Sequence, residues 1–191
     1  HIAKSIPIDF KIYVKDHIHG HLRGWRDIKQ YKEIKELPNV VLIHPSYSSK
    51  KLIKNCKLII SVNGGGSTIE AASKNKPAII FGDMPIDVLP SIYKIKTLER
   101  LPELIKIALK TTINPEYFKK YNQLIIKNKI NFNWDELEIL RNEQFYSGNI
   151  LSDVEYPENK VKEFFEKNEE MFKILTDGYI EKMNEFKSST K

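Results

Sequence analysis

Short apolar runs alternate with amphipathic helical stretches over residues 9–96, and this alternation restricts the fold more than any other feature of the chain. The predicted strands, rich in β-branched or aromatic residues, are 10–14, 40–43, 58–62, 78–81 and 92–95. The predicted helices between and after them are 25–37, 48–55, 67–73 and 99–110. Strands that alternate with helices at this spacing predict a Rossmann-like α/β domain, with one parallel sheet covered by helices on both faces.

The pattern changes after about residue 112, where the strand signals end. The predicted helices in this second part are 115–128, 134–145 and 158–187. We therefore expect a Rossmann-like domain over residues 1–111 and a helical extension over residues 112–191 that packs on it. The apolar residues of the last helix predict a stripe that packs onto the sheet domain or onto a partner.

Composition excludes several classes of protein. Cys56 is the only cysteine, so a disulfide scaffold is excluded, and its apolar surroundings predict a small core residue. No apolar stretch reaches the roughly 18 residues that a membrane helix needs. The net charge of +6 suits an anionic small ligand or a membrane surface as well as it suits nucleic acid.

The strongest motif is the run SVNGGGSTIEAASKNKPAIIFGD at residues 61–83. A buried strand ends at Asn63, and three glycines then let the backbone approach a ligand closely and adopt a positive φ. The helix that follows offers unpaired N–H groups and the positive end of its dipole, which is a site for phosphate. The predicted phosphate-binding residues are Asn63, Gly64, Gly65, Gly66, Ser67 and Thr68.

Two interpretations of this motif remain open. Glu70 is placed to accept hydrogen bonds from ribose hydroxyls, but Ser67 and Glu70 also have the spacing of a capping box. The glycine spacing is neither the Walker pattern nor the dinucleotide pattern, so a tight turn with a serine cap and no ligand is the alternative.

A second motif, YVKDHIHGHLRGW, follows the first predicted strand. Lys15, His17 and Arg23 are predicted to neutralise a phosphate, with His17 as the catalytic candidate. The alternation of His17, His19 and His21 permits a zinc site. No acidic or cysteine partner has the right spacing, so we expect no metal.

Two further loops follow predicted strands. In HPSYSSKKL, Ser46 and its neighbours are candidates for contact with a nucleobase, and a plain turn with a serine cap is the alternative. In FGDMPIDVLP, Asp83 and Asp87 are candidates for substrate contact, although aspartate in a proline-containing loop is usually a turn former.

Taken together, IAKSIPIDFKIYVKDHIHG and LPNVVLIHPSYSSKKLIKNCKLIISVNGGGSTIEAASKNKPAIIFGD resemble the capsule polysaccharide biosynthesis proteins, which include β-Kdo transferases. The resemblance covers roughly residues 2–110 and implies the nucleotide-binding C-terminal half of a GT-B glycosyltransferase. The family histidine that contacts the donor phosphate matches His17, the family glutamate matches Glu70, and the turn matches Gly64 to Thr68. Ile18 stands where the family has proline.

The expected function is therefore the donor-binding domain of a glycosyltransferase in capsule or surface polysaccharide biosynthesis. The nucleotide sugar would be a substrate, with no further cofactor. The opening IAKSIP reads as the end of a helix already in progress, so we expect an N-terminal acceptor domain, or a partner chain, to be missing. No nucleic acid partner is expected, and the expected location is cytoplasmic or at the inner face of the cell membrane.

Three alternatives remain. Two are enzymes of similar fold: a polyol-phosphate transferase of the teichoic-acid type and a sugar-nucleotide 2-epimerase-like domain. The third is a non-catalytic module that binds a nucleotide or a partner protein.

Overall fold

The computed structural model describes residues 1–17, 20, 26–62, 65–146 and 156–189. It divides into two compact units, unit 1 from His1 to Gln123 and unit 2 from Leu124 to Lys191. The boundary lies inside helix α7 (Pro115–Asn128), further along the chain than residue 111, where the predicted first domain ends.

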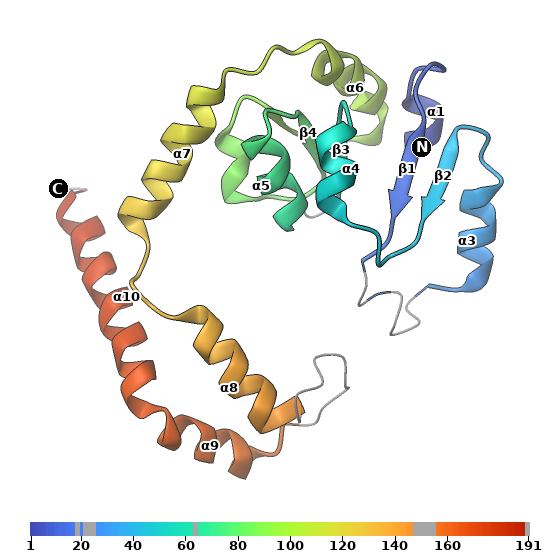
Figure 1. Ribbon diagram of the computed structural model, residues 1–191. Helices are drawn as coiled ribbons and strands as arrows, with labels where there is room; N and C mark the ends of the chain where they lie inside the picture. Colours follow the sequence, from blue (N-terminus) through green and yellow to red (C-terminus); the bar gives the residue numbers. More distant parts are fainter. Residues whose placement is uncertain (18–19, 21–25, 63–64, 147–155, 190–191) are drawn as a thin grey trace. The chain divides into compact units, whose positions relative to one another are not determined.

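The described strands of unit 1 form two parallel sheets (Figure 1). Strand β1 (Ile12–Lys15) pairs with β2 (Val40–Ile43), while β3 (Ile59–Ser61), β4 (Ala78–Ile80) and β5 (Ile92–Lys94) pair in that order. A mixed α/β fold with parallel strands is thus confirmed, but the described strands do not join into the one sheet that was predicted. Side-chain patterns identify strands without specifying their neighbours, because edge-to-edge pairing depends on backbone geometry.

The core of unit 1 surrounds β4, whose three residues are all buried. Ala78 and Ile80 pack with Ala71 and Ala72 on one face of the sheet. Ile79 packs on the other face in the cluster that contains Leu101, Ile105 and Ala108. Alternate residues of one short strand therefore hold helices on both faces, which explains its unbroken apolar sequence.

Most helices of unit 1 lie close to the predicted ranges. They are α1 (Ile2–Ser5), α3 (Ile28–Lys35), α4 (Ser49–Asn55), α5 (Gly65–Ser73) and α6 (Leu101–Lys110), with 3₁₀ turns η1 (Pro85–Val88) and η2 (Leu98–Arg100). Ser48 stands at the N-cap of α4, but its side chain makes none of the predicted cap hydrogen bonds. The first strand begins later than predicted, because the Phe10 amide donates to the Pro7 carbonyl in a turn.

Cys56, at the end of α4, is only partly buried. Its Sγ donates to the Ile53 carbonyl at 3.3 Å. Burial raises the pKa of the thiol, as expected for a packing residue rather than a reactive one.

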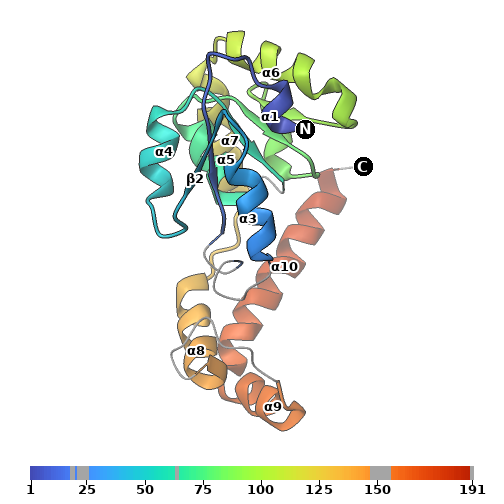
Figure 2. The ribbon, with the colours of Figure 1, turned by 90° about the vertical axis from the view of Figure 1, so that its right-hand side faces the viewer.

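The described part of unit 2 is helical. Beyond the end of α7 it contains α8 (Trp134–Tyr146), α9 (Glu158–Lys167) and α10 (Glu169–Ser189). The single helix predicted over 158–187 is wrong: α9 ends before Asn168, and the chain changes direction between α9 and α10, as Figure 1 and Figure 2 both show. Asn168 has non-helical angles of φ −118 and ψ 26, and its Nδ2 donates to the Phe164 carbonyl at 2.8 Å. Such a side-chain hydrogen bond to the backbone competes with the backbone hydrogen bonds of a regular helix, and α9 ends there.

Aromatic contacts hold the helices of unit 2 together. The Phe145 ring lies 5.0 Å from Tyr156 and 5.3 Å from Phe164, centroid to centroid, and Phe164 is buried. The predicted apolar stripe is thus covered in part, whereas Phe165 and Ile174 remain exposed. Within the described ranges, no helix combines the length and the apolar character that crossing a membrane requires.

Candidate functional site

The centre of the predicted site is the first turn of α5, which follows β3 closely. This helix begins at Gly65, two residues before the predicted start at Ser67. Ser67 is consequently the third helical residue and not a cap. The amides of Gly65, Gly66 and Ser67 belong to the set of N–H groups that have no partner within a helix. Asn63 and Gly64 lie outside the described residues.

Gly65 and Gly66 are exposed, and the fold itself gives no reason for glycine at either position. A Cβ added at either one would meet no atom within 4 Å, and neither has the positive φ that the motif predicted. Glycine in a helix is less stable than alanine by roughly 0.5–1 kcal/mol. The two glycines therefore leave open space beside unpaired N–H groups, and they make the helix less stable.

Thr68 lies in the same turn and is fully buried, at 0% exposure. Its Oγ1 has no hydrogen-bond partner in the described part of the chain. A buried hydroxyl without a partner is unfavourable by about 1–3 kcal/mol. The first turn of α5 thus has an unsatisfied donor in addition to its free amides.

Glu70 lies in the second turn of α5 and is half-buried. The capping box with Ser67, the alternative interpretation, does not form, because Ser67 is inside the helix. Among the described residues, no hydrogen bond or ion pair involves the Glu70 carboxylate, so it remains open to an external donor.

The residues after β1 form a hydrogen-bonded cluster around Asp16, whose side chain is 11% exposed. Arg26 Nε donates to it at 2.8 Å, Tyr31 Oη at 2.7 Å and the His17 amide at 2.9 Å. Burial raises the pKa of Asp16, but the hydrogen bonds from Tyr31, Arg26 and His17 outweigh it, so the pKa lies below its usual value. Asp16 thereby fixes the backbone of His17 against α3.

Sequence reasoning missed this cluster, although a carboxylate directly after a strand was a usable signal. Its partners stand 10 and 15 residues further along, across a segment whose course no periodicity predicts. Lys15 is the last residue of β1, one position beyond the predicted end of that strand, whereas Arg23 lies outside the described residues.

The residues after β2 lie next to those after β1, because Lys15 pairs with Ile43 in the parallel register. The predicted Ser46 contacts His44, with its Oγ 2.7 Å from Nδ1, and its amide donates to the same Nδ1 at 3.2 Å. Sequence reasoning did not single out His44, although a histidine directly after a strand was the available signal. This edge of the small sheet therefore gathers Lys15, His17, His44 and Ser46.

Asp83 and Asp87, the candidates for substrate contact, pair with Lys94. Lys94 Nζ contacts the Asp83 carboxylate and lies 3.1 Å from Asp87 Oδ2. The hydrogen bond from Lys94 lowers the pKa of Asp83. This ion-pair group occupies the carboxyl edge of the three-stranded sheet, where α5 also begins, because β3, β4 and β5 are parallel.

The predicted site is thus in two parts, one after β1 and β2 and one at the start of α5. No hydrogen bond or ion pair between described residues joins the two parts. In the described ranges no three His, Cys, Asp or Glu side chains could together hold a metal ion. His19 and His21, which suggested zinc, lie outside those ranges.

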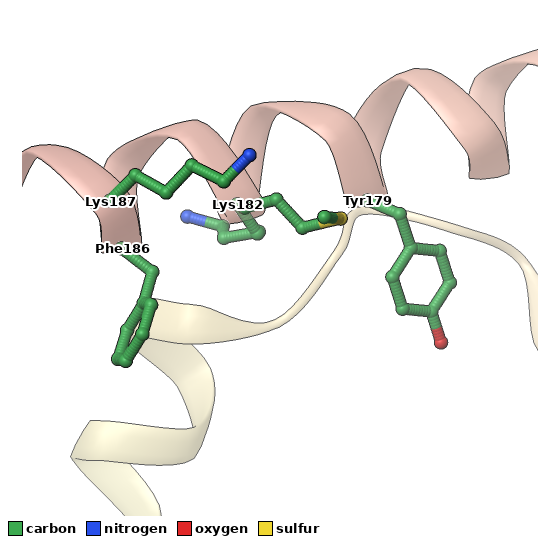
Figure 3. Close-up of a pocket in the computed structure, with 5 residues that line it drawn as sticks. Tyr179, Lys182, Phe186 and Lys187 are labelled. Atoms are coloured by element: carbon green, nitrogen blue, oxygen red, sulfur yellow. The ribbon is translucent and has the colours of Figure 1, made fainter.

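An apolar hollow on α10 in unit 2 contains none of the predicted site residues (Figure 3). It is lined by Tyr179, Lys182, Met183, Phe186 and Lys187. Lys182 is already paired with Glu185, at 2.8 Å. The hollow offers few polar groups and does not resemble a phosphate site.

Comparison with protein-family models, curated proteins and solved structures finds no match to this chain.

Proposed function

We propose that unit 1 binds the phosphate of a nucleotide sugar at the first turn of α5, as the donor-binding domain of a glycosyltransferase. The proposal includes a Rossmann-like arrangement of the GT-B type and a role in capsule or surface polysaccharide synthesis. The resemblance in the sequence supports them.

One observation carries the proposal: α5 opens on two exposed glycines that the fold does not require. Side chains there would lie beside the unpaired amides, where phosphate oxygens bind at helix N-termini. The buried Thr68 hydroxyl in the same turn supports the assignment, since a phosphate oxygen would satisfy it.

In the proposed reaction an acceptor oxygen attacks the anomeric carbon of the donor sugar, and the bond to the nucleotide phosphate breaks. Negative charge then grows on the leaving phosphate. The amides and dipole of α5 stabilise that charge, together with Lys15, His17 and Arg23. Glu70 accepts hydrogen bonds from the ribose, and the acceptor comes from a further domain or a partner chain.

The proposal can be tested by calorimetry on Gly65→Val with nucleoside diphosphates. Valine would fill the space that the phosphate needs, so we expect binding to weaken at least tenfold. Ser73→Val is the matched control, because it adds a similar side chain at the other end of the same helix, about 12 Å away at 1.5 Å per residue. Equal affinities for Gly65→Val and wild type would place the site elsewhere.

The alternative enzymes differ in the nucleotide-linked substrates that they bind. A thermal-shift screen with CMP-, UDP-, GDP- and CDP-linked compounds separates them, because a ligand of the folded state raises the melting temperature. A response to CDP-polyols alone would favour the polyol-phosphate transferase. A response to UDP-N-acetylhexosamines with conversion at C2 would favour the epimerase, and binding without turnover would favour the non-catalytic module.

A further inference from the structure

Between residues 37 and 82 the charges are almost all positive. Glu70 is the only acidic residue in this stretch, and there is no arginine. The basic residues, called the lysine face below, are Lys50, Lys51, Lys54, Lys57, Lys74 and Lys76.

Three residues of the lysine face lie on α4, Lys74 follows the end of α5, and Lys57 and Lys76 come just before β3 and β4. Helix α4 packs against α5, as Figure 1 and Figure 2 show. Ile59 pairs with Ala78, and the Ile59 amide donates to the Pro77 carbonyl at 3.1 Å, which brings Lys57 and Lys76 together at the amino ends of β3 and β4. Lys54 follows Lys50 by four residues and Lys51 by three, so the three lysines of α4 share one side of the helix.

These side chains are available for binding. All are exposed except Lys76, which is half-exposed. Among the described residues none of the six takes part in an ion pair, whereas lysines elsewhere in the chain pair with Asp83, Asp87, Glu116, Glu166 or Glu185.

A favourable interaction with the helix dipole does not explain all three lysines of α4. Lys54 lies in the last turn of α4, where a positive charge is favourable. Lys50 and Lys51 lie in the first turn, where the helix dipole disfavours positive charge and no acidic residue compensates. Their presence there points to an external anion.

We propose that the lysine face binds the surface of an anionic phospholipid bilayer. Clusters of four to eight basic residues are attracted to such surfaces, at about fivefold in affinity for each residue. Lysine suits a diffuse layer of headgroups, whereas arginine is favoured where phosphates or bases are read at defined geometry. This observation favours lipid over nucleic acid.

Lys57 and Lys76 lie at the amino ends of β3 and β4, whereas the first turn of α5 lies at their carboxyl ends. The proposed lipid-binding face is independent of the proposed nucleotide site, so either proposal can fail without the other.

The test is co-sedimentation with vesicles of phosphatidylcholine, with and without about 30% phosphatidylglycerol. Wild type should bind only the anionic vesicles and dissociate when salt shortens the Debye length. Lys50→Gln/Lys51→Gln/Lys54→Gln should weaken binding about a hundredfold. The control Lys29→Gln/Lys32→Gln/Lys35→Gln removes the same charge from exposed positions on α3 and should change binding less than about threefold.

Circular dichroism should show that both triple variants are folded, and Lys74→Gln/Lys76→Gln provides a second variant on the same face. Equal loss in the two triple variants would show that net charge alone drives binding and would overturn the proposal. Equal binding of wild type to neutral vesicles would overturn it as well. So would tight binding of duplex DNA, measured by fluorescence anisotropy, without binding to vesicles.

Discussion

Replacing Thr68 with valine should make the free protein more stable and a poorer ligand binder. Thr68 is fully buried and its hydroxyl has no partner in the described chain. Valine has nearly the same shape and removes a desolvation penalty of about 1–3 kcal/mol. At the lower end of that range, the melting temperature of a unit this size should rise by roughly 3–5 °C.

Thr111→Val is the matched control, because the same substitution there removes satisfied hydrogen bonds. The Thr111 hydroxyl donates to the Ile107 carbonyl at 2.9 Å and lies 2.5 Å from Tyr93 Oη. Losing them should destabilise the protein by about 1 kcal/mol and lower the melting temperature by a similar number of degrees.

Urea unfolding and calorimetry can measure both variants, with an unchanged m-value showing that the unfolded state is not altered. If the phosphate satisfies the Thr68 hydroxyl, Thr68→Val should also bind nucleoside diphosphate about tenfold more weakly, since hydrogen bonds to charged groups contribute ~1.5–3 kcal/mol. A Thr68→Val protein that is less stable than wild type would refute the reasoning, because the hydroxyl would then have a partner in the free protein.

Four other variants test separate parts of the account. Glu70→Gln should keep its melting temperature but lose roughly ten- to a hundredfold in affinity for ribonucleotides, and much less for 2′,3′-dideoxy analogues; wild-type affinity would remove Glu70 from the ribose site. Tyr31→Phe should lower the free energy of unfolding at pH 7, because Asp16 loses the hydrogen bond from the Tyr31 hydroxyl. Because folding lowers the pKa of Asp16, the ionised carboxylate stabilises the protein fully above its unfolded-state pKa, and this stabilisation disappears as pH falls through its folded-state pKa. Urea titrations near pH 2 should therefore show a smaller effect of Tyr31→Phe. Gly66→Ala should raise the melting temperature, whereas Gly178→Ala, whose Cβ would lie 2.5 Å from an isoleucine Cγ2, should lower it; the opposite order would mean that the space at Gly66 is not open.

The helices and strands could largely be predicted because their signals are local. Helix α7 and strand β2 have the predicted bounds, and the other strands of unit 1 lie within two residues of theirs. Periodic apolar residues specify both the type of an element and its buried face. An unbroken apolar run, as in β4, indicates instead a strand that is buried on both faces.

Features that depend on tertiary contacts could not be predicted. The division into two sheets and the cluster around Asp16 both involve partners that the local pattern does not specify. The start of α5 was placed at Ser67 because serine is a common cap, whereas the helix begins within the glycines. This shift turns Ser67 from a cap into a residue of the first turn and removes the capping box that was the alternative role of Glu70.

The most direct test of the phosphate site is to follow the backbone amides of unit 1 by ¹H–¹⁵N NMR during titration with a nucleoside diphosphate. The account predicts that the amides of Gly65, Gly66 and Ser67 shift most and saturate together, and that the bare nucleoside shifts them far less. Largest shifts at His44 and Ser46, or on α10, with the start of α5 unchanged, would contradict it.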